Sequence, residues 1–349
     1  MYFASDNWAG AHPLVAERLV KAAGSYSVPY GEGQTDRKVQ KTLSEIFERD
    51  VSVFFVGTGT AANALSLASL ARPASVIFCH PRAHVMHEGG AVELMTNGGK
   101  LVPARPCGPG ASKIDPEGLT KAIAPYLSTD ASVGNRIAFT LSQATEAGTI
   151  YSVEEIAALS SVAHSAGLKV HMDGARFSNA IAALGVTPAE MTWKAGIDIL
   201  SLGGTKNGCW CAEAIVFFNP DDAAALPVLR KRAGHLFSKS SFISTQFDRW
   251  LENGLWLDLA RHANGMGEKI AAAVRASGHA RLAWETGSNQ QFAIMSDEAA
   301  AAIRAAGATF HDWPAPDGFD GLGPGEAIRR LIACFATTDE DVERLAALL

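Results

Sequence analysis

Short apolar runs alternate with helical stretches through the first two thirds of the chain. The runs are rich in β-branched and aromatic residues, which is typical of strands buried on both faces of a sheet. We expect such strands at 51–57, 74–79, 136–142, 168–174 and 197–204. The helical stretch after residue 151 begins with Ser152 and Glu155 in the spacing of a capping box. This alternation predicts an α/β fold with a mostly parallel central sheet flanked by helices.

The pattern changes after about residue 235. A long helical stretch at 258–278 leads to shorter strand candidates at 290–295, 308–313 and 329–335. We therefore predict two domains: residues 1–235 form a large domain that includes the N-terminal segment, and residues 236–349 form a smaller C-terminal α+β domain.

Composition excludes several classes of protein. The chain has 349 residues, 48% of them hydrophobic, and a net charge of −6. This acidity argues against a nucleic-acid partner, and no apolar stretch is long enough to span a membrane. Five cysteines, most of them inside apolar runs, favour reduced thiols in the cytoplasm. Cys209 and Cys211 lack a second pair of ligands, so we predict no metal site.

Candidate site residues follow the predicted strands, because ligands of open parallel sheets bind beyond the carboxyl ends of the strands. The run at 51–57 leads into Thr58, Gly59 and Thr60 at a helix start. Backbone N–H groups and hydroxyls at such a place favour a phosphate group.

The next two candidates follow later strands. Asp173 and Arg176 come after the run at 168–174, and a structural ion pair between them is one interpretation, because a buried acid needs a partner. Lys206 lies in the stretch LSLGGTKNG (200–208), whose glycines would let a ligand approach the backbone. A phosphate site, an acid and an amine in this order are what pyridoxal phosphate requires.

Six motifs carry a family resemblance: FASDN (3–7), YGEGQT (30–35), GTGTAAN (57–63), AHVMHEGG (83–90), HMDGARF (171–177) and GGTKNG (203–208). With them the chain resembles, over nearly its whole length, the low-specificity L-threonine aldolases and their phenylserine aldolase branch. The resemblance implies the transferase-like fold type I of pyridoxal-phosphate enzymes. It also implies retro-aldol cleavage of L-β-hydroxy-α-amino acids, such as threonine, allo-threonine and phenylserine, to glycine and an aldehyde.

The resemblance also assigns cofactor residues. Lys206 would hold pyridoxal 5′-phosphate as a Schiff base, Asp173 would pair with the pyridine nitrogen, and His84 would stack on the ring. Thr58, Gly59 and Thr60 would bind the phosphate. Arg176 would lie beside the cofactor. In the basic stretch at 230–239, Lys231 is the candidate for a phosphate contact across a subunit interface, and a solvated basic face is the alternative.

For the substrate carboxylate, the resemblance implies Ser5, Arg176 and Arg330. Arginine suits this task because its planar fork binds both carboxylate oxygens. Alternation along a strand points Arg329 to the opposite face. Glu88 would orient His84 or a water.

One further residue depends on a second subunit. Tyr30 would reach a neighbouring subunit's site, which implies a homodimer or homotetramer with active sites at the interface.

One position departs from the family pattern. Many threonine aldolases carry a histidine that approaches the substrate hydroxyl, and Thr145 stands at the corresponding place in LSQATEAGTIY. The base for the β-hydroxyl is therefore open, with His84 and an ordered water as candidates. We expect loose discrimination between threonine and allo-threonine, and room for a bulky aryl group.

Two other classes of function stay open. The chain could be another type I pyridoxal-phosphate enzyme, an aminotransferase or a β-eliminating lyase. It could also be a non-catalytic binding protein on the same scaffold. Retention of Lys206, Asp173 and Arg330 together argues against the non-catalytic alternative.

Overall fold

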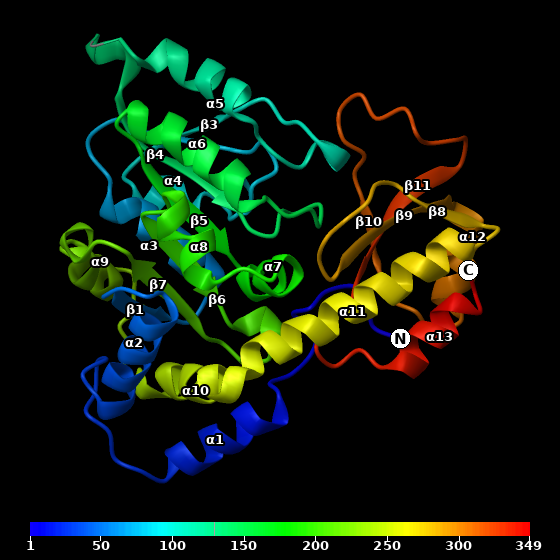
Figure 1. Cartoon of the computed structure of the whole chain (residues 1–349), viewed down its shortest axis with the longest axis horizontal. Helices are drawn as coiled ribbons and strands as arrows, with labels where there is room; N and C mark the ends of the chain where they lie inside the picture. The colour runs from blue at the N-terminus through cyan, green and yellow to red at the C-terminus, as the bar shows by residue number, and fades with distance from the viewer. Residues whose placement is uncertain (129) are drawn as a thin grey trace.

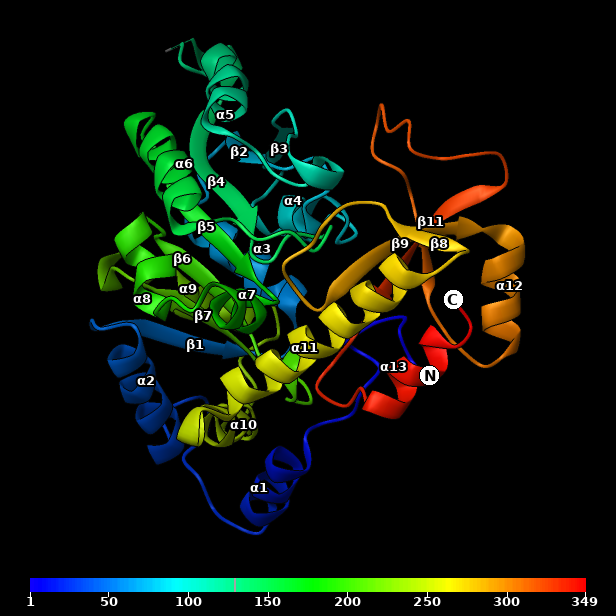
Figure 2. The same cartoon turned by 45° about the vertical axis from the view of Figure 1, so that its right-hand side comes forward.

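The computed structural model describes residues 1–128 and 130–349, and its larger sheet has seven strands in the order β1–β7–β6–β5–β4–β2–β3 (Figures 1 and 2). These strands are β1 (Ser52–Val56), β2 (Ser75–Cys79), β3 (Lys100–Pro103), β4 (Asn135–Ser142), β5 (Lys169–Gly174), β6 (Ile199–Gly203) and β7 (Glu213–Phe217). Every neighbouring pair is parallel except those of β7, which runs antiparallel to β1 and β6. The predicted mostly parallel sheet is confirmed. The sequence pattern missed β3 and β7.

Helices cover both faces of this sheet. One face carries α3 (Gly59–Ser69), α4 (Ala91–Met95) and α9 (Leu226–Arg232). The other face carries α2 (Gln34–Ile46), α5 (Pro116–Ile123), α6 (Val153–Ser165), α7 (Phe177–Leu184), α8 (Pro188–Met191) and α10 (Ser241–Leu251), and α1 (Pro13–Ala23) packs on α10. In β5, Val170 and Met172 join the core beneath α6, whereas Asp173 bonds to α3. Strand alternation thus separates core residues from site residues.

A second, antiparallel sheet has four strands in the order β10–β11–β9–β8. They are β8 (Ala280–Leu282), β9 (Gln290–Ser296), β10 (His311–Trp313) and β11 (Glu326–Ile332). The associated helices are α11 (Leu255–Ala276), α12 (Asp297–Ala305) and α13 (Asp339–Ala346), and α11 runs from α10 to this sheet (Figure 1). The smaller C-terminal α+β unit expected from the sequence is therefore present.

The N-terminal segment lies against the second sheet. The Phe3 N–H donates to the Thr309 oxygen at 2.8 Å, and the Phe3 oxygen accepts from the Ile332 N–H at 2.8 Å. Phe3 packs in the hydrophobic core of the smaller sheet, whereas Phe247 of α10 packs in the core of the larger sheet. The domain division at residue 235 stays a prediction. None of the described helices is long and apolar enough to cross a membrane.

Candidate active site

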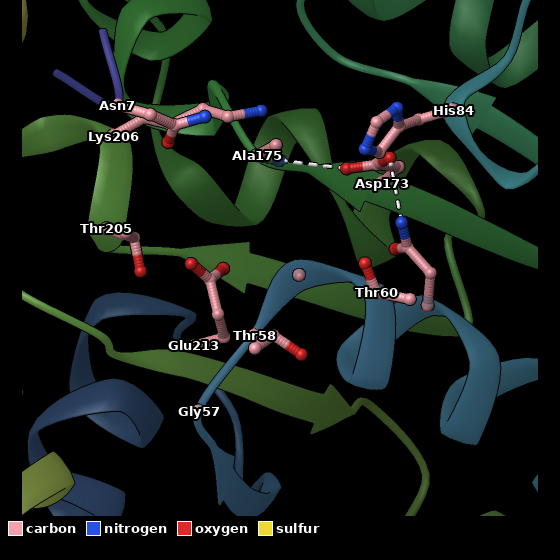
Figure 3. Close-up of a pocket in the computed structure, with 12 residues that line it drawn as sticks. Asn7, Gly57, Thr58, Thr60, His84, Asp173, Ala175, Thr205, Lys206 and Glu213 are labelled. Atoms are coloured by element: carbon pink, nitrogen blue, oxygen red, sulfur yellow. Dashed lines mark hydrogen bonds between the residues drawn. The ribbon is translucent and has the colours of Figure 1, made fainter. Parts of the chain in front are cut away.

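A cavity with two lobes lies at the carboxyl ends of β4, β5 and β6. The lobes share Asn7, His84, Asp173, Ala175 and Lys206 as lining residues. The inner lobe, of about 240 Å³, extends to residues 57–60 (Figure 3). The outer lobe, of about 350 Å³, extends to Ser5, Arg176 and Arg330. Side chains from both sheets and from the N-terminal segment therefore meet in one space.

Lys206 lies where the two lobes meet. β6 ends at Gly203, and a 3₁₀ turn over Thr205–Asn207 carries the lysine, which lines both lobes. Figure 3 shows its side chain among the residues of the inner lobe. Burial lowers the pKa of this amine, and the positive charge of Arg176 lowers it further. A lowered pKa favours the neutral amine, which is the form that attacks a carbonyl group.

Gly203 and Gly204, the two glycines before Lys206, lie in close contact with neighbouring backbone. A Cβ on Gly203 would lie 2.8 Å from the Ala175 Cα, and one on Gly204 would lie 2.9 Å from the Ala212 oxygen. Neighbouring backbone therefore requires glycine at both positions, and the expectation that these glycines let a ligand approach the backbone stays a prediction. Gly59 differs, because nothing lies within 4 Å of the Cβ position there.

Asp173 is a buried carboxylate that lacks a cation. Its Oδ2 accepts from the Asn63 side chain at 3.0 Å, and its Oδ1 accepts from the Ala175 N–H at 3.0 Å. Among the described residues, no Lys, Arg or His nitrogen forms an ion pair with it. A buried charge without a partner is costly. The site therefore favours a ligand that brings a cationic N–H group to Asp173.

Arg176 pairs with Asp6 instead. Its Nε donates to Oδ2 at 2.7 Å and its Nη2 donates to Oδ1 at 2.9 Å. The alternative of a structural Asp173–Arg176 pair is thus wrong, because Asp6 from the N-terminal segment occupies the fork of the guanidinium. Arg176 still lines the outer lobe.

The inner lobe ends at the N-terminus of α3. Thr58, Gly59 and Thr60 line it, and the Thr58 Oγ1 caps the helix by accepting from the Ala61 N–H at 3.1 Å. Exposed N–H groups and the helix dipole favour an anion there. Glu213 also lines this lobe, and burial raises its pKa to about 7. The carboxyl can therefore be neutral beside an anion.

His84 follows β2 in a 3₁₀ turn and lines both lobes. Its side chain is 53% exposed, while the Glu88 side chain beside it is 1% exposed. The His84 Nε2 and the Glu88 Oε1 are 3.8 Å apart. Burial, and secondarily the charge of Asp173, raise the pKa of Glu88 to about 7. Glu88 lies behind His84 and is not a lining residue of either lobe.

Arg330 is a partly buried arginine without an acidic partner among the described residues. Its Nη2 donates to the Ala4 oxygen at 3.4 Å, its guanidinium lies 4.9 Å from the centre of the Trp313 ring, and its Nε has no hydrogen-bond partner. Ser5 lines the outer lobe with it. Arg329 points elsewhere and pairs with Asp297 and Asp312. The outer lobe thus offers an unmatched positive charge to an anionic ligand.

Comparison with known proteins identifies the family. A family model described as beta-eliminating lyase matches residues 2–318. A low specificity L-threonine aldolase from Pseudomonas sp. (strain NCIMB 10558) is 38% identical over 346 residues, which cover 99% of this chain and 96% of that protein. The chain belongs to the low-specificity L-threonine aldolase family. The resemblance stated from the sequence motifs is confirmed.

Solved structures agree with membership of the threonine aldolase family. A threonine aldolase from Leishmania major superimposes with a TM-score of 0.90 at 26% identity, over 99% of this chain and 98% of that one. A serine palmitoyltransferase from Sphingomonas wittichii matches with a TM-score of 0.70 at 16% identity, over 100% of this chain and 86% of that one, which shows the fold alone. The predicted type I fold is confirmed.

The place of Thr145 in this family member differs from the expectation. Its Oγ1 pairs with the Thr149 Oγ1 at 2.8 Å, and that hydroxyl pairs with the Ser112 Oγ at 2.6 Å. Thr145 is buried in this hydroxyl chain and is not a lining residue of either lobe. Its neighbour Glu146 lines the outer lobe instead. The prediction that Thr145 meets the substrate is wrong, because the turn after β4 directs it inward.

Several residues of the threonine aldolase cavity were missed from the sequence. Asp6 and Asn63 lie inside the motifs FASDN and GTGTAAN, so the motifs could have identified them. Glu146, Glu213 and Gln290 carried no such signal, because only packing brings them to the cavity.

Two predicted residues of this aldolase family chain lie away from the cavity. The Lys231 Nζ lies 5.3 Å from the centre of the Tyr30 ring, and neither residue lines a lobe. From the same basic stretch, His235 accepts from the Gly57 N–H at 3.5 Å within one chain. No group of three or more metal-binding side chains occurs within residues 1–128 and 130–349.

Proposed function

We propose that this protein cleaves L-β-hydroxy-α-amino acids to glycine and an aldehyde with pyridoxal 5′-phosphate as cofactor. The proposal rests on one observation above all. Asp173, a buried carboxylate without a cation among the described residues, and Arg330, a partly buried cation without a carboxylate, line one cavity together with the Lys206 amine. The 38% identical relative from Pseudomonas carries the name low specificity L-threonine aldolase, which supports the same reaction.

The residues present fit this cofactor. Asp173 would hold the protonated ring nitrogen, the start of α3 at Thr58, Gly59 and Thr60 would hold the phosphate, and Lys206 would hold the aldehyde carbon. His84 would lie against the ring. When bound, the cofactor withdraws electrons from the substrate Cα and so stabilises negative charge there.

The same cavity can orient an amino acid. Arg330, with Ser5 and Arg176, would bind the substrate carboxylate, since Arg330 has no acidic partner of its own in the described chain. A fixed carboxylate sets the direction of the Cα–Cβ bond relative to the cofactor, and such orientation accounts for much of the rate enhancement of enzymes. Glu88 would hold His84 from behind.

A product assay tests the proposed function. The holoenzyme is incubated separately with phenylserine, threonine and allo-threonine, and glycine and aldehyde are measured. Equal amounts of both are expected. Because the matching family model is described as beta-eliminating lyase, ammonia and a keto acid are the products of the competing reaction. Their appearance in place of glycine, or a need for a keto-acid acceptor, would contradict the proposal.

Three further features belong to this proposal. The enzyme works as a homodimer or homotetramer in which Tyr30 and Lys231 reach a neighbouring subunit's site. Phenylserine is among its substrates, because the outer lobe adjoins a further pocket of about 460 Å³ lined by Trp313, Pro81 and Pro314. The protein is cytoplasmic, which suits its five free cysteines.

A further inference from the structure

Glu146 lines the outer lobe, but none of the roles described so far uses it. It lies in the turn after β4, and the last residue of β4, Ser142, pairs with Asp173 of β5. The carboxyl therefore lies at the same sheet edge as the cofactor residues. It shares the outer lobe with Lys206 and Arg330.

The contacts of Glu146 fix one oxygen and leave the other for the cavity. Oε1 accepts from the Ser142 hydroxyl at 2.8 Å and from the His84 backbone N–H at 2.9 Å. No described residue donates to Oε2, and Oε2 is not among the buried atoms that lack partners. The carboxyl is thus held by two donors while its second oxygen faces the lobe.

Most other side chains of the outer lobe suit a proton acceptor less well, and His87, the second histidine of the lobe, is exposed. The oxygens of Asp173 already accept from Asn63 and Ala175. Arginine cannot accept a proton, and the Ser142 hydroxyl is used as a donor to Glu146. Thr145 lies outside the lobe, and under the proposed function the ring of His84 would lie against the cofactor. Glu146 is the remaining carboxylate of this lobe within the described residues.

We propose that Glu146 is a catalytic residue whose Oε2 accepts the β-hydroxyl proton of the substrate. This inference rests on the proposed retro-aldol function. The O–H bond breaks as the proton moves to Oε2, and the electron pair of that bond forms the second C–O bond of the aldehyde. The Cα–Cβ bond breaks, and its pair stays on Cα, which later takes a proton and becomes the Cα of glycine. Glu146 returns its proton to solvent.

The surroundings of Glu146 support this role at neutral pH. Burial, followed by the negative charge of Asp173, raises the pKa of the carboxyl to about 7. A general base is most effective when its pKa lies near the working pH. Because only the ionised form accepts a proton, kcat/KM should rise with pH up to about 7 and then level off.

Other titratable groups face the same lobe and could shape the pH profile: Asp173 from β5, His84 and His87 from the segment after β2, Arg82, Arg176, Lys206 and Arg330. Glu88 lies behind His84, and its pKa is raised to the same value, about 7. The experiment must therefore separate Glu146 from Glu88.

The test compares the holoenzyme of the wild type with Glu146→Gln, which keeps the size of the side chain and an oxygen that accepts from His84. Two reactions are measured: cleavage of phenylserine, and exchange of the α-proton of glycine in D₂O. Glycine has no β-hydroxyl, so its exchange needs the cofactor site and the carboxylate contacts but no base for a hydroxyl. Loss of a general base lowers kcat/KM for cleavage by at least about a hundredfold, and exchange should change by less than about threefold.

Glu88→Gln is the matched control, because it removes the other carboxyl group whose pKa is raised to about 7, and Glu88 does not line the lobe. In Glu88→Gln, kcat/KM for cleavage should still fall as the pH is lowered below about 7, as in the wild type. The same pH profile is expected for Glu146→Asp, which retains a carboxylate. Cleavage by Glu146→Gln near the wild-type rate would overturn the proposal. An equal loss of cleavage and exchange would also overturn it, since that outcome shows a structural role. If the wild-type enzyme exchanges the α-proton of glycine but releases no aldehyde from phenylserine, the proposed function itself fails.

Discussion

At the scale of single residues, the cavity is defined by charges that lack partners within the described chain. Asp173 is buried and Arg330 is partly buried, and each would be stabilised by a ligand of opposite charge. An unpaired buried charge lowers the stability of the empty protein, so it is retained where a ligand compensates for it. Lys206 differs from both, because its lowered pKa makes it reactive.

Replacement of Lys206 tests covalent cofactor attachment. The wild type should be yellow as purified, and Lys206→Ala should lose the visible absorbance band of the attached cofactor, because no neutral amine remains at the lobe junction. Absorbance spectra measure the cofactor band, and circular dichroism checks that the variant is folded. Reduction with borohydride followed by peptide mapping should find the cofactor on Lys206, and a label on another lysine would contradict the assignment.

Replacement of Arg330 tests the carboxylate site. Arg330→Ala should raise the Michaelis constant for amino-acid substrates about ten- to hundredfold, since a charge-assisted hydrogen bond is worth about 1.5–3 kcal/mol. The cofactor absorbance should stay nearly unchanged. Steady-state kinetics and spectra measure both effects.

Arg329→Ala is the control for that experiment. Arg329 is buried and pairs with Asp297 and Asp312, so its loss should lower the melting temperature more than it changes the Michaelis constant. The reverse pattern, with Arg329→Ala impaired in substrate binding and Arg330→Ala normal, would move the carboxylate site by one residue.

At the scale of elements, close contacts between backbones set the shape of the site. β6 and the segment after β5 approach so closely at Gly203 that a Cβ would lie 3.0 Å from the Ala175 oxygen as well as 2.8 Å from its Cα. Asp173 lies in β5, two residues before Ala175, and Lys206 lies in the turn after β6. The separation of these two residues therefore depends on the close backbone contact at Gly203.

A pair of glycine variants tests this dependence. Gly203→Ala should destabilise the cofactor-free protein by about 1–3 kcal/mol, the usual effect of overpacking. Gly59→Ala should be neutral or slightly stabilising, because its Cβ meets nothing within 4 Å and alanine favours a helix. Urea unfolding measures both. Equal stabilities of the two variants would show that the backbone at β6 yields to the added methyl group.

At the scale of the whole molecule, the segment between α1 and α2 projects large side chains. Tyr26 is fully exposed, and Val28 and Tyr30 are about half exposed, at 51% and 44%. Tyr30 also adopts a left-handed backbone conformation with a φ of 63°. Exposed apolar groups gathered on one segment favour contact with another chain. This supports the proposed homo-oligomer.

Mixing of inactive subunits tests that assembly. Light scattering should give a mass at least twice that of one chain. If Tyr30 completes a neighbour's site, an equimolar mixture of Tyr30→Ala and Lys206→Ala, reassociated after mild dissociation, should regain roughly a quarter of wild-type activity in a dimer. This happens because a mixed pair contains one site with both residues intact. No recovery above the Tyr30→Ala activity alone would show that each chain supplies its own complete site.

The sequence by itself determined the α/β class, most strands of the larger sheet, and the identities of Lys206, Asp173 and Arg330 as site residues. Such features are local: apolar runs, capping residues and short motifs act over a few neighbouring positions. Alternation along one strand placed Arg329 and Arg330 on opposite faces, and the family resemblance selected Arg330.

Only the tertiary structure decided what those residues contact. It paired Arg176 with Asp6 across 170 positions, turned Thr145 inward, and brought Glu146 to the cavity. It also showed that Gly203 serves the backbone of a neighbouring segment. These outcomes depend on the packing of segments distant in sequence, and no local pattern records which side chain of a turn will face a cavity.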